Sequence, residues 1–448
     1  MTSFALPATF SDAPQFLARL QEIHPEFACV TKLQSSDGPM AQAFSWKERT
    51  FANRWAIHPM EGWDGTVDGL PTEDTLRRWG NFGRSGAALI WGGEAFAVTP
   101  EGRANPHQLH QGSHAEVLQG LQELMAALRA GQGEAGLQPK QSYVGLQLTH
   151  SGRWARPSAT QLSPRTMMRH DFLDDKVGIQ DDSALLTDAE LADLPQAYAD
   201  AACLAEQAGF DFVDIKCCHG YLLHESLAAH DRPGPYGGPF ENRTRLFREI
   251  VHAVRQACPA LDLGVRLSAT DTLDGGFAEA SEFLSLLESL EISWVNLTQG
   301  SPYYCSHLQR PAAFPPSDGI PPTEDPLHAV WHHLQVTRAL KKKHPKLIFL
   351  GTGYTYLQDY LAHVAEYEVG EGFVDFVGIG RMVLSYPEMP QDHLAGRPFV
   401  RKKICRTFSD CTTGPRNGMR SGCYPLDPEY RSREEAKKVR ELRPNRKG

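Results

Sequence analysis

The sequence predicts a closed parallel α/β barrel, a (β/α)8 TIM barrel, with a short C-terminal extension. Three observations predict this fold class. The 448-residue chain contains eight apolar, strand-like runs. These runs alternate with segments of helical periodicity, as the crossovers between parallel strands require. The runs are apolar along nearly their whole length, which is typical of parallel strands that are buried on both faces.

The predicted strands lie at residues 50–60, 87–97, 142–150, 211–218, 261–269, 292–300, 346–353 and 373–381. An open, doubly wound sheet is the alternative, but no early Gly-x-Gly-x-x-Gly motif opens a helix. We therefore divide the chain into an N-terminal arm (1–49), a barrel (50–400) and a C-terminal extension (401–448).

Composition limits the classes of partner. The formal net charge is -9, so nothing favours nucleic acid as the main partner. No apolar run approaches about 18 residues, and the N-terminus lacks a signal-peptide pattern, so we expect no membrane association. The nine cysteines are scattered and are typical of thiols in a reducing compartment. We expect a cytoplasmic protein that acts on a small molecule, and we predict no metal site.

Functional side chains of such a barrel lie at the carboxyl ends of its strands. Strand seven ends with Gly351, Thr352 and Gly353, and strand eight ends with Gly380 and Arg381. Glycines there let backbone N–H groups approach a phosphate, although tight turns also use glycine for steric reasons. The two segments together favour phosphate binding.

Two polar residues stand on otherwise apolar strands. Arg266 either forms a buried ion pair or faces an electron-rich ligand atom in the barrel mouth. Gln147 is either a satisfied core amide or a ligand contact. Combined with a phosphate site, these residues indicate a pocket for a phosphorylated planar cofactor.

Several motifs resemble the Old Yellow Enzyme family of FMN-dependent oxidoreductases. They are "NRWAIHPM", "GAALIWGGEAFAVTPEGR", "LQLTHSGR", "HGYLLHESL", "RPGPYGGPFENRTRL", "VRLSATD" and "GIGRMVLSYP", and they span roughly residues 53–398. The most specific is the segment that runs from "HGYLL" to "ENR". The resemblance implies FMN as the cofactor, held by Pro59, Met60, Glu61, Ala95, Gln147, Arg266, Gly351, Thr352, Gly353, Gly380 and Arg381.

The resemblance also implies a reaction. NADH or NADPH reduces the flavin, whose N5 then passes a hydride to the β-carbon of an α,β-unsaturated carbonyl compound. Tyr221 occupies the position of the tyrosine that protonates the α-carbon. A phenol with a pKa of about 10 suits that role, although Tyr221 could also simply pack the barrel top. Both the nucleotide and the unsaturated carbonyl compound are small molecules.

The pair that grips the substrate oxygen departs from the family pattern. Relatives carry His-x-x-His or His-x-x-Asn, whereas this chain has Lys216 and His219. Lys216 can donate to an oxyanion, act as a base or imine former, or form a salt bridge with Asp214 or Glu61. Glu61 replaces a small polar residue or a thiol, and its charge would lower the flavin potential. We therefore predict a Glu61–Lys216 pair and a substrate unlike simple enones.

The extension resembles the cysteine segment of a branch that includes 2,4-dienoyl-CoA reductase and trimethylamine dehydrogenase. Only Cys411 and Cys423 keep the register, since Ile404 and Thr407 occupy the other ligand positions and Cys405 is one residue displaced. A 4Fe–4S cluster normally needs four thiolates, so we predict a structural remnant and no cluster. The extra domains of that branch are also not expected. Electrons would come from NAD(P)H directly or from a partner protein. The sequence does not decide whether the chain forms a homo-oligomer.

The long loop after strand six carries Tyr303, Tyr304 and His307, which either contact substrate or pack the loop. Three alternatives to alkene reduction remain at this point. One is flavin-dependent amine oxidation or demethylation. Another is a flavin-free barrel that uses Lys216 as a Schiff-base lysine. The last is a flavin-binding module without catalysis.

Overall fold

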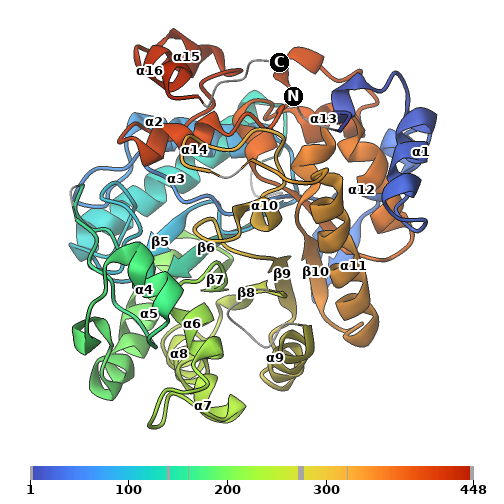
Figure 1. The fold of residues 1–448 in the computed structure, drawn as a ribbon. Coiled ribbons are helices and arrows are strands. Elements are labelled where there is room, and N and C mark those ends of the chain that lie inside the picture. Colours follow the sequence, from blue (N-terminus) through green and yellow to red (C-terminus); the bar gives the residue numbers. More distant parts are fainter. Residues whose placement is uncertain (1–3, 139–141, 160, 271–276, 320, 444–448) are drawn as a thin grey trace.

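A computed structural model describes residues 4–138, 142–159, 161–270, 277–319 and 321–443 of the chain. Its centre is a parallel barrel with helices around it, as the sequence predicts (Figure 1). The strands are β3 (Trp55–Ile57), β4 (Leu89–Ile90), β5 (Ala95–Ala97), β6 (Tyr143–Thr149), β7 (Phe212–Cys217), β8 (Asp262–Ser268), β9 (Trp294–Thr298), β10 (Ile348–Gly351) and β11 (Phe376–Ile379). The pairing of β4 with β6 closes the barrel.

The second predicted strand is interrupted. The sequence predicts one strand over 87–97, but the structure divides it into β4 and β5, which both pair with β6. Gly92 stands at the break with a φ of +64°, a conformation that few residues other than glycine adopt. A Cβ atom there would lie 2.9 Å from the backbone nitrogen of Gln147. The close approach of the two strands therefore explains the break.

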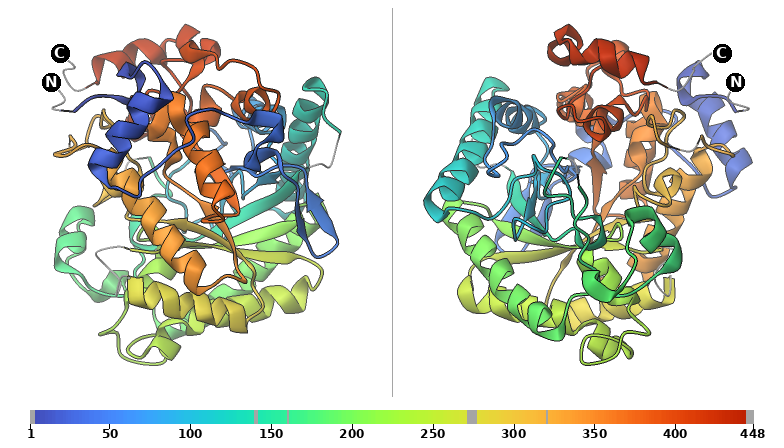
Figure 2. Two further views of the ribbon diagram at one scale, coloured as in Figure 1. Left: turned by 90° about the vertical axis from the view of Figure 1, so that its right-hand side faces the viewer. Right: turned by 60° about the vertical axis from the view of Figure 1, so that its left-hand side comes forward.

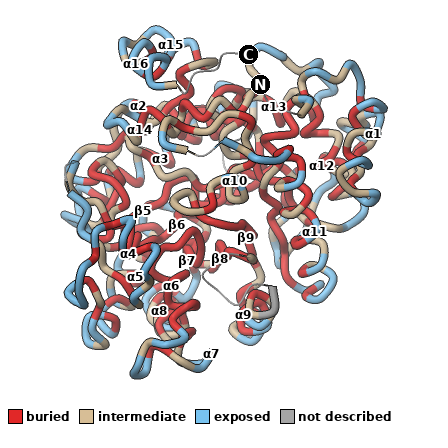
Figure 3. The backbone as a smooth tube through the Cα atoms, viewed as in Figure 1, coloured by how far each residue is buried: buried red, intermediate tan, exposed pale blue. Residues whose placement is uncertain are grey.

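Helices surround the barrel in both further views (Figure 2). Those that follow the strands are α2 (Glu73–Arg84), α3 (His114–Glu134), α5 (Asp188–Ala208), α8 (Arg245–Ala257), α9 (Phe277–Ser289), α11 (Leu327–Lys343), α12 (Leu361–Gly370) and α13 (Met389–Leu394). Helix α5 shows how local signals set the boundaries: Thr187 and Glu190 form a capping box, and Gly209 ends the helix in the left-handed conformation. Figure 3 shows buried strands at the centre and exposure on the outer helices.

Shorter helices lie in the loops and at the ends of the chain. They are α1 (Ala13–Ile23), α4 (Asp171–Val177), α6 (Leu222–Ala228), α7 (Phe240–Arg243), α10 (Ser306–Gln309), α14 (Asp410–Arg416), α15 (Pro428–Ser432) and α16 (Glu435–Glu441). None of the described helices is long and apolar enough to cross a membrane.

Aromatic side chains fill one end of the barrel. This aromatic base consists of Phe51, Trp91, Tyr143, Phe212, Trp294 and Phe376. A hairpin of β1 (Phe44–Trp46) and β2 (Arg49–Phe51) closes it from below, with Trp46 5.2 Å from Trp294 between ring centroids. The hairpin crosses the boundary we predicted at residue 49/50, because Phe44 on one side pairs with Phe51 on the other. The base leaves the opposite end of the barrel for polar groups.

The C-terminal extension packs onto the barrel. Arg77 of α2 binds Asp427 through two hydrogen bonds of 2.8 and 2.9 Å. Asp74 of the same helix forms salt bridges with Arg420 and Arg433. The extension is therefore held at the top of the barrel, where Figure 1 shows it in red.

Candidate active site

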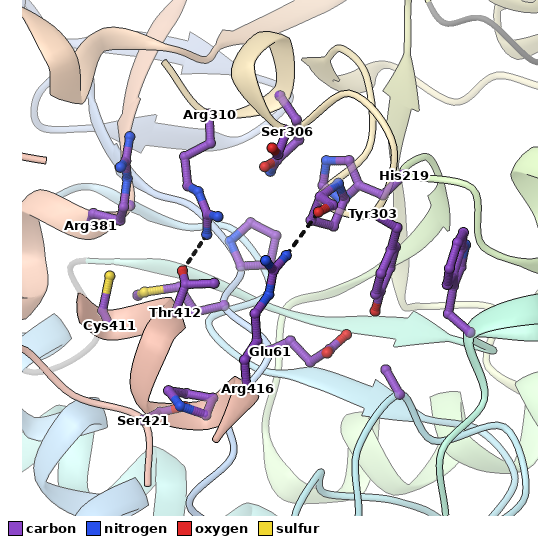
Figure 4. A pocket seen from close by; sticks show the side chains of 18 of the residues that line it. Glu61, His219, Tyr303, Ser306, Arg310, Arg381, Cys411, Thr412, Arg416 and Ser421 are labelled. Carbon is purple, nitrogen blue, oxygen red and sulfur yellow. Dashed lines mark hydrogen bonds between the residues drawn. The ribbon is translucent and has the colours of Figure 1, made fainter. Parts of the chain in front are cut away.

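A cavity of about 700 Å³ opens at the carboxyl ends of the strands, which is where a TIM barrel carries its functional groups. Its walls come from strand ends, from the loops after β6 and β9, and from the C-terminal extension (Figure 4). The sequence-predicted residues that line it are Pro59, Met60, Glu61, Gln147, Lys216, His219, Tyr221, Arg266, Tyr303, Tyr304, Thr352, Gly353, Gly380 and Arg381. The volume lies in the range usual for small-molecule and cofactor sites.

Four side chains form a reaction cluster: Glu61, Lys216, Tyr221 and Tyr303. The predicted Glu61–Lys216 pair is present, with 3.8 Å between Nζ of Lys216 and Oε2 of Glu61. The hydroxyl of Tyr221 donates to the same Glu61 oxygen and lies 3.3 Å from the hydroxyl of Tyr303. The ammonium of Lys216 sits 3.5 Å from the centroid of the Tyr221 ring. One phenol thus contacts a carboxylate at its hydroxyl and a cation at its ring.

This arrangement shifts the proton affinities of the cluster. Burial first, and then the negative charge of Glu61, raise the pKa of Tyr221 well above its ordinary value. Burial lowers the pKa of Lys216, and Glu61 opposes that effect. Tyr221 is therefore held protonated.

His219 stands at the end of β7. Burial and the neighbouring charges of Arg266 and Lys216 lower the pKa of His219 well below its ordinary value, so the ring is neutral. Its Nε2 lies 3.3 Å from Oγ1 of Thr298, and its carbonyl accepts a hydrogen bond of 2.8 Å from Ser301. The backbone φ is +67°, which is rare for a histidine and typical of residues whose position is functionally constrained.

The middle of the barrel carries a polar layer beneath the cavity. Gln147 donates to Asp214 over 2.5 Å, while His58 contacts Asn296 and Thr352 at 3.3 and 3.2 Å. Asp214, rather than a ligand, is thus the partner of the Gln147 Nε2 group. The other residue that we expected to face a ligand, Arg266, behaves differently.

Arg266 is a buried cation that points at the cavity. Its Nε has no hydrogen-bond partner among the described residues, and burial lowers its pKa. A desolvated guanidinium without an acceptor is costly unless a ligand supplies one. An electron-rich planar ring in the cavity would satisfy it. This orphaned donor, with the cavity volume, fits the predicted FMN.

Two arginines lie close together in one wall of the cavity. Arg381 donates to the carbonyl of Pro311 over 2.8 Å, yet its Nη1 is buried without a partner in the described part of the chain. Among the described residues, the guanidinium of Arg310 donates to the hydroxyl of Thr412, at 2.5 Å. Burial, together with the like charge of Arg381, lowers the pKa of Arg310 to about 9. Two neighbouring, desolvated cations call for a dianion such as a phosphate ester.

Three predicted contacts lie outside the cavity wall. Ala95 is buried in β5, and Gly351 ends β10 with its Cα facing Tyr354. His307 is exposed on the short helix α10. None of the three lines the cavity as the described residues define it. Gly353, by contrast, lines the cavity with a φ of +99° that only glycine adopts readily.

Sequence reasoning missed part of the wall. Trp63, Trp154, Arg156 and Arg310 come from loops, and Cys411, Thr412, Arg416 and Ser421 come from the extension. The indole of Trp154 stacks on Tyr303 at 4.0 Å and an interplanar angle of 4°. The backbone N–H of Trp63 donates to Ser421 over 2.8 Å. No local sequence pattern signals these contacts, since they join segments far apart in the chain.

The three cysteines of the extension lie close enough to act electrostatically on one another. Cys405 and Cys423 are buried, whereas Cys411 lines the cavity. Within the described ranges, no group of three or more histidine, cysteine, aspartate or glutamate side chains is arranged to hold a metal ion. The absence of a 4Fe–4S cluster stays a prediction.

The fold and the site together define a class: a TIM barrel whose mouth is built for a planar, phosphorylated cofactor beside a buried tyrosine. The family model described as "NADH:flavin oxidoreductase / NADH oxidase family" matches residues 42–398. The chain therefore belongs to this family, which includes the Old Yellow Enzymes and carries FMN.

Individual relatives agree with that assignment. The chain is 32% identical over 206 residues to an NADPH dehydrogenase of Halalkalibacterium halodurans, across 46% of this chain and 55% of that protein. It is 29% identical over 265 residues to an NADPH dehydrogenase of Bacillus subtilis, across 57% of this chain and 71% of that protein. The alignment thus spans little more than half the length of the first of these relatives.

Solved structures share the fold. A 2-naphthoyl-CoA reductase complexed with 2-naphthoyl-CoA has a TM-score of 0.67 and 19% identity, covering 88% of this chain and 57% of that chain. Morphinone reductase has a TM-score of 0.58 and 21% identity, covering 82% of this chain and 92% of that chain. At these identities the likeness concerns the barrel alone.

Proposed function

We propose that the protein is an FMN-dependent reductase that uses NAD(P)H to reduce an α,β-unsaturated carbonyl compound, with Tyr221 as the proton donor. The observation that carries the proposal is the position of Tyr221. Its hydroxyl lies in the cavity wall beside Tyr303, and the neighbouring Lys216 and His219 line the same cavity. An acid and two groups that can donate to an oxygen thus converge on one space.

FMN, when bound, supplies two-electron hydride chemistry between the nicotinamide and the alkene. The chain would hold it through Arg266 at the ring, beside Gln147 whose Nε2 group is bound to Asp214, and through Arg310, Arg381, Thr352 and Gly353 at the phosphate. The fixed charge of Arg266 favours the electron-rich state of a ring beside it. The overall change is balanced: NAD(P)H, a proton and the alkene give NAD(P)⁺ and the saturated carbonyl compound.

Tyr221 handles the proton in this proposal. The β-carbon of the substrate gains the hydride, and the α-carbon of the substrate takes the proton of the Tyr221 hydroxyl. The C=C bond between them becomes a single bond. A phenolate then forms next to Glu61, which is unfavourable, but Lys216 over the ring stabilises it. Solvent returns the proton. Lys216 therefore acts as the compensating charge that lets Tyr221 work beside a carboxylate.

The substrate oxygen needs a donor where negative charge develops. His219 and Lys216 are the candidates, since both line the cavity at the end of β7. A neutral His219 still donates through one ring N–H. Lys216 adds a compact charge, which makes this grip more cationic than the paired imidazoles of relatives.

The test is an anaerobic titration of the purified holoenzyme with NADH and with NADPH, followed by a panel of unsaturated carbonyl oxidants. We expect one nucleotide to bleach the flavin absorbance near ~450 nm and an enone to restore it. If neither nucleotide bleaches the flavin, the reductase proposal is wrong. If bleaching occurs but no alkene restores the colour, the substrate class is wrong.

The other candidates have weaker support. Amine oxidation would use a carboxylate to receive an ammonium group, but Glu61 is already engaged by Lys216 and Tyr221. A Schiff-base mechanism would use Lys216 without flavin, which does not account for the orphaned donors of Arg266 and Arg381. Borohydride trapping of a carbonyl substrate would revive the lysine mechanism.

A further inference from the structure

The charge of the cavity differs from the charge of the chain. Of the described residues that line it, eight are lysine or arginine and two are acidic, whereas the whole chain has a net charge of -9. The positive charge exceeds what the cofactor needs. Arg78 is neutralised by Asp64 and Glu94, and Lys216 by Glu61. Arg266, Arg310 and Arg381 face the positions proposed for FMN.

Three further cations line the cavity: Lys176 and two arginines. Lys176 is exposed on α4, with its ammonium 5.0 Å from the centroid of the Phe172 ring. Arg156 comes from the loop after β6, and its Nη2 donates only to the carbonyl of Ala159, at 2.9 Å, among the described residues. Arg416 comes from the end of α14 and donates to the carbonyl of Pro302 over 2.9 Å. It also pairs with Asp318, whose side chain is 59% exposed and therefore strongly screened by water. Figure 4 shows Arg416 reaching across the cavity toward Tyr303.

Both guanidinium groups flank the reaction cluster. Each is close enough to Tyr303 to act electrostatically on its hydroxyl, which in turn contacts the hydroxyl of Tyr221. Aromatic rings line the same part of the cavity: Arg156 lies 5.9 Å from the ring centroid of Trp63, and Trp154 stacks on Tyr303. The outer cavity thus combines flat apolar walls with two planar cations.

We propose that Arg156 and Arg416 form an anion subsite, which makes the preferred substrate an aromatic unsaturated carbonyl compound that bears a carboxylate. The aromatic part would lie against Trp63 and Trp154, and the carboxylate would accept hydrogen bonds from the two guanidinium groups. Arginine suits this task because its fork matches the geometry of a carboxylate. This inference rests on the proposed function, since it names the substrate class of the same site.

The test measures binding without turnover. The probes are benzylideneacetone with a para carboxylate and its neutral para-carboxamide isostere, titrated calorimetrically into the oxidised holoenzyme with no reductant. We expect the carboxylate to bind at least about tenfold more tightly at low ionic strength, as a charge-assisted hydrogen bond implies. This preference should shrink as salt is added.

Variants locate the subsite. Arg156→Gln and Arg416→Gln should each reduce the preference for the carboxylate by about tenfold and leave the affinity for the carboxamide unchanged. Arg440→Gln is the matched control, because Arg440 is exposed on the same extension and does not line the cavity. It should keep the full preference. Arg416→Lys keeps the positive charge and loses the forked guanidinium, so its preference for the carboxylate should lie between those of the wild type and Arg416→Gln.

Equal affinity of the wild-type protein for both probes would overturn the subsite, as would a full preference in both glutamine variants. If Arg416→Gln does not fold, Arg156→Gln and the salt dependence decide alone. Failure of the proposed function is a separate result: the flavin would not be bleached by NAD(P)H, while the carboxylate preference would persist.

Discussion

The two ends of the barrel are built from the same strands and differ in almost every physical property. The aromatic base packs six rings, including Trp294, whose ring centroid lies 5.3 Å from that of Phe51. The mouth holds a cavity of about 700 Å³, lined by a buried tyrosine and by arginines that have donors without a partner among the described residues. Strand β8 shows the contrast within seven residues, since Gly264 lies against Trp91 of the base and Arg266 faces the cavity. The base supplies stability that the charged mouth does not.

The largest expected effect concerns the mouth. Tyr221→Phe should lower the rate of alkene reduction by about a hundredfold to ten-thousandfold, since it removes the proposed proton donor. Flavin reduction by NAD(P)H and the melting temperature should change little, and stopped-flow absorbance separates the two half-reactions. Tyr198→Phe is the control, because Tyr198 is buried in α5 away from the cavity. A comparable loss of alkene-reduction rate in Tyr198→Phe would show that the effect is not specific to the barrel mouth.

The base should show the opposite behaviour. Trp294→Ala should lower the free energy of unfolding by about 3–5 kcal/mol, because it leaves a large cavity among the rings. The molecules that stay folded should bind FMN with unchanged affinity. Denaturant unfolding of the holoenzyme and its FMN dissociation constant are the two measurements. A loss of FMN affinity would show that base and mouth are coupled.

The next largest effect is expected where the FMN phosphate is proposed to bind. Arg310→Gln should weaken FMN binding by roughly tenfold to a hundredfold, since a charge-assisted hydrogen bond contributes about 1.5–3 kcal/mol. Ultrafiltration of the flavin from the variant measures this, with Arg440→Gln as the control for loss of one charge. Unchanged retention of FMN would mean that Arg310 does not contact the phosphate.

The smallest effect is on the flavin potential. Glu61→Gln removes a negative charge from the cavity and should raise the potential by tens of millivolts, because 1.4 kcal/mol corresponds to about 30 mV in a two-electron couple. It should also lower the pKa of Tyr221, since Glu61 is one of the groups that raise that pKa. Spectroelectrochemistry measures the potential. No change would mean that Lys216 already cancels the charge of Glu61.

Proton uptake gives an independent check on the core. Burial lowers the pKa of His150 to about 4, below the ordinary histidine value of about 6.5. As pH falls from 6.5 to 4, the unfolded chain binds a proton at this residue and the folded chain does not. The free energy of unfolding should therefore fall across that window. His150→Phe should flatten this part of the stability profile in denaturant titrations.

Some features of the site were predictable because they follow from barrel topology. Glu61 and Lys216 stand at the ends of strands that the barrel brings together at one mouth, so their pairing could be inferred from position. The break at Gly92 could not, since it depends on how closely β4 approaches β6. Sequence position could not decide between the two roles of His307 either, because only the course of its loop leaves this side chain exposed.

The sequence by itself determined the barrel and the family, since apolar runs and local motifs lie in consecutive residues, but it did not show that the second run divides into β4 and β5. Only the tertiary structure decided what surrounds the substrate space. Arg310, Arg156 and Arg416 come from two loops and the extension, and contacts such as Arg77 with Asp427 join residues 350 positions apart. Contacts of that kind depend on the packing of the whole chain, and no local pattern encodes them. The proposed anion subsite therefore depends on the packing of the extension over the barrel mouth.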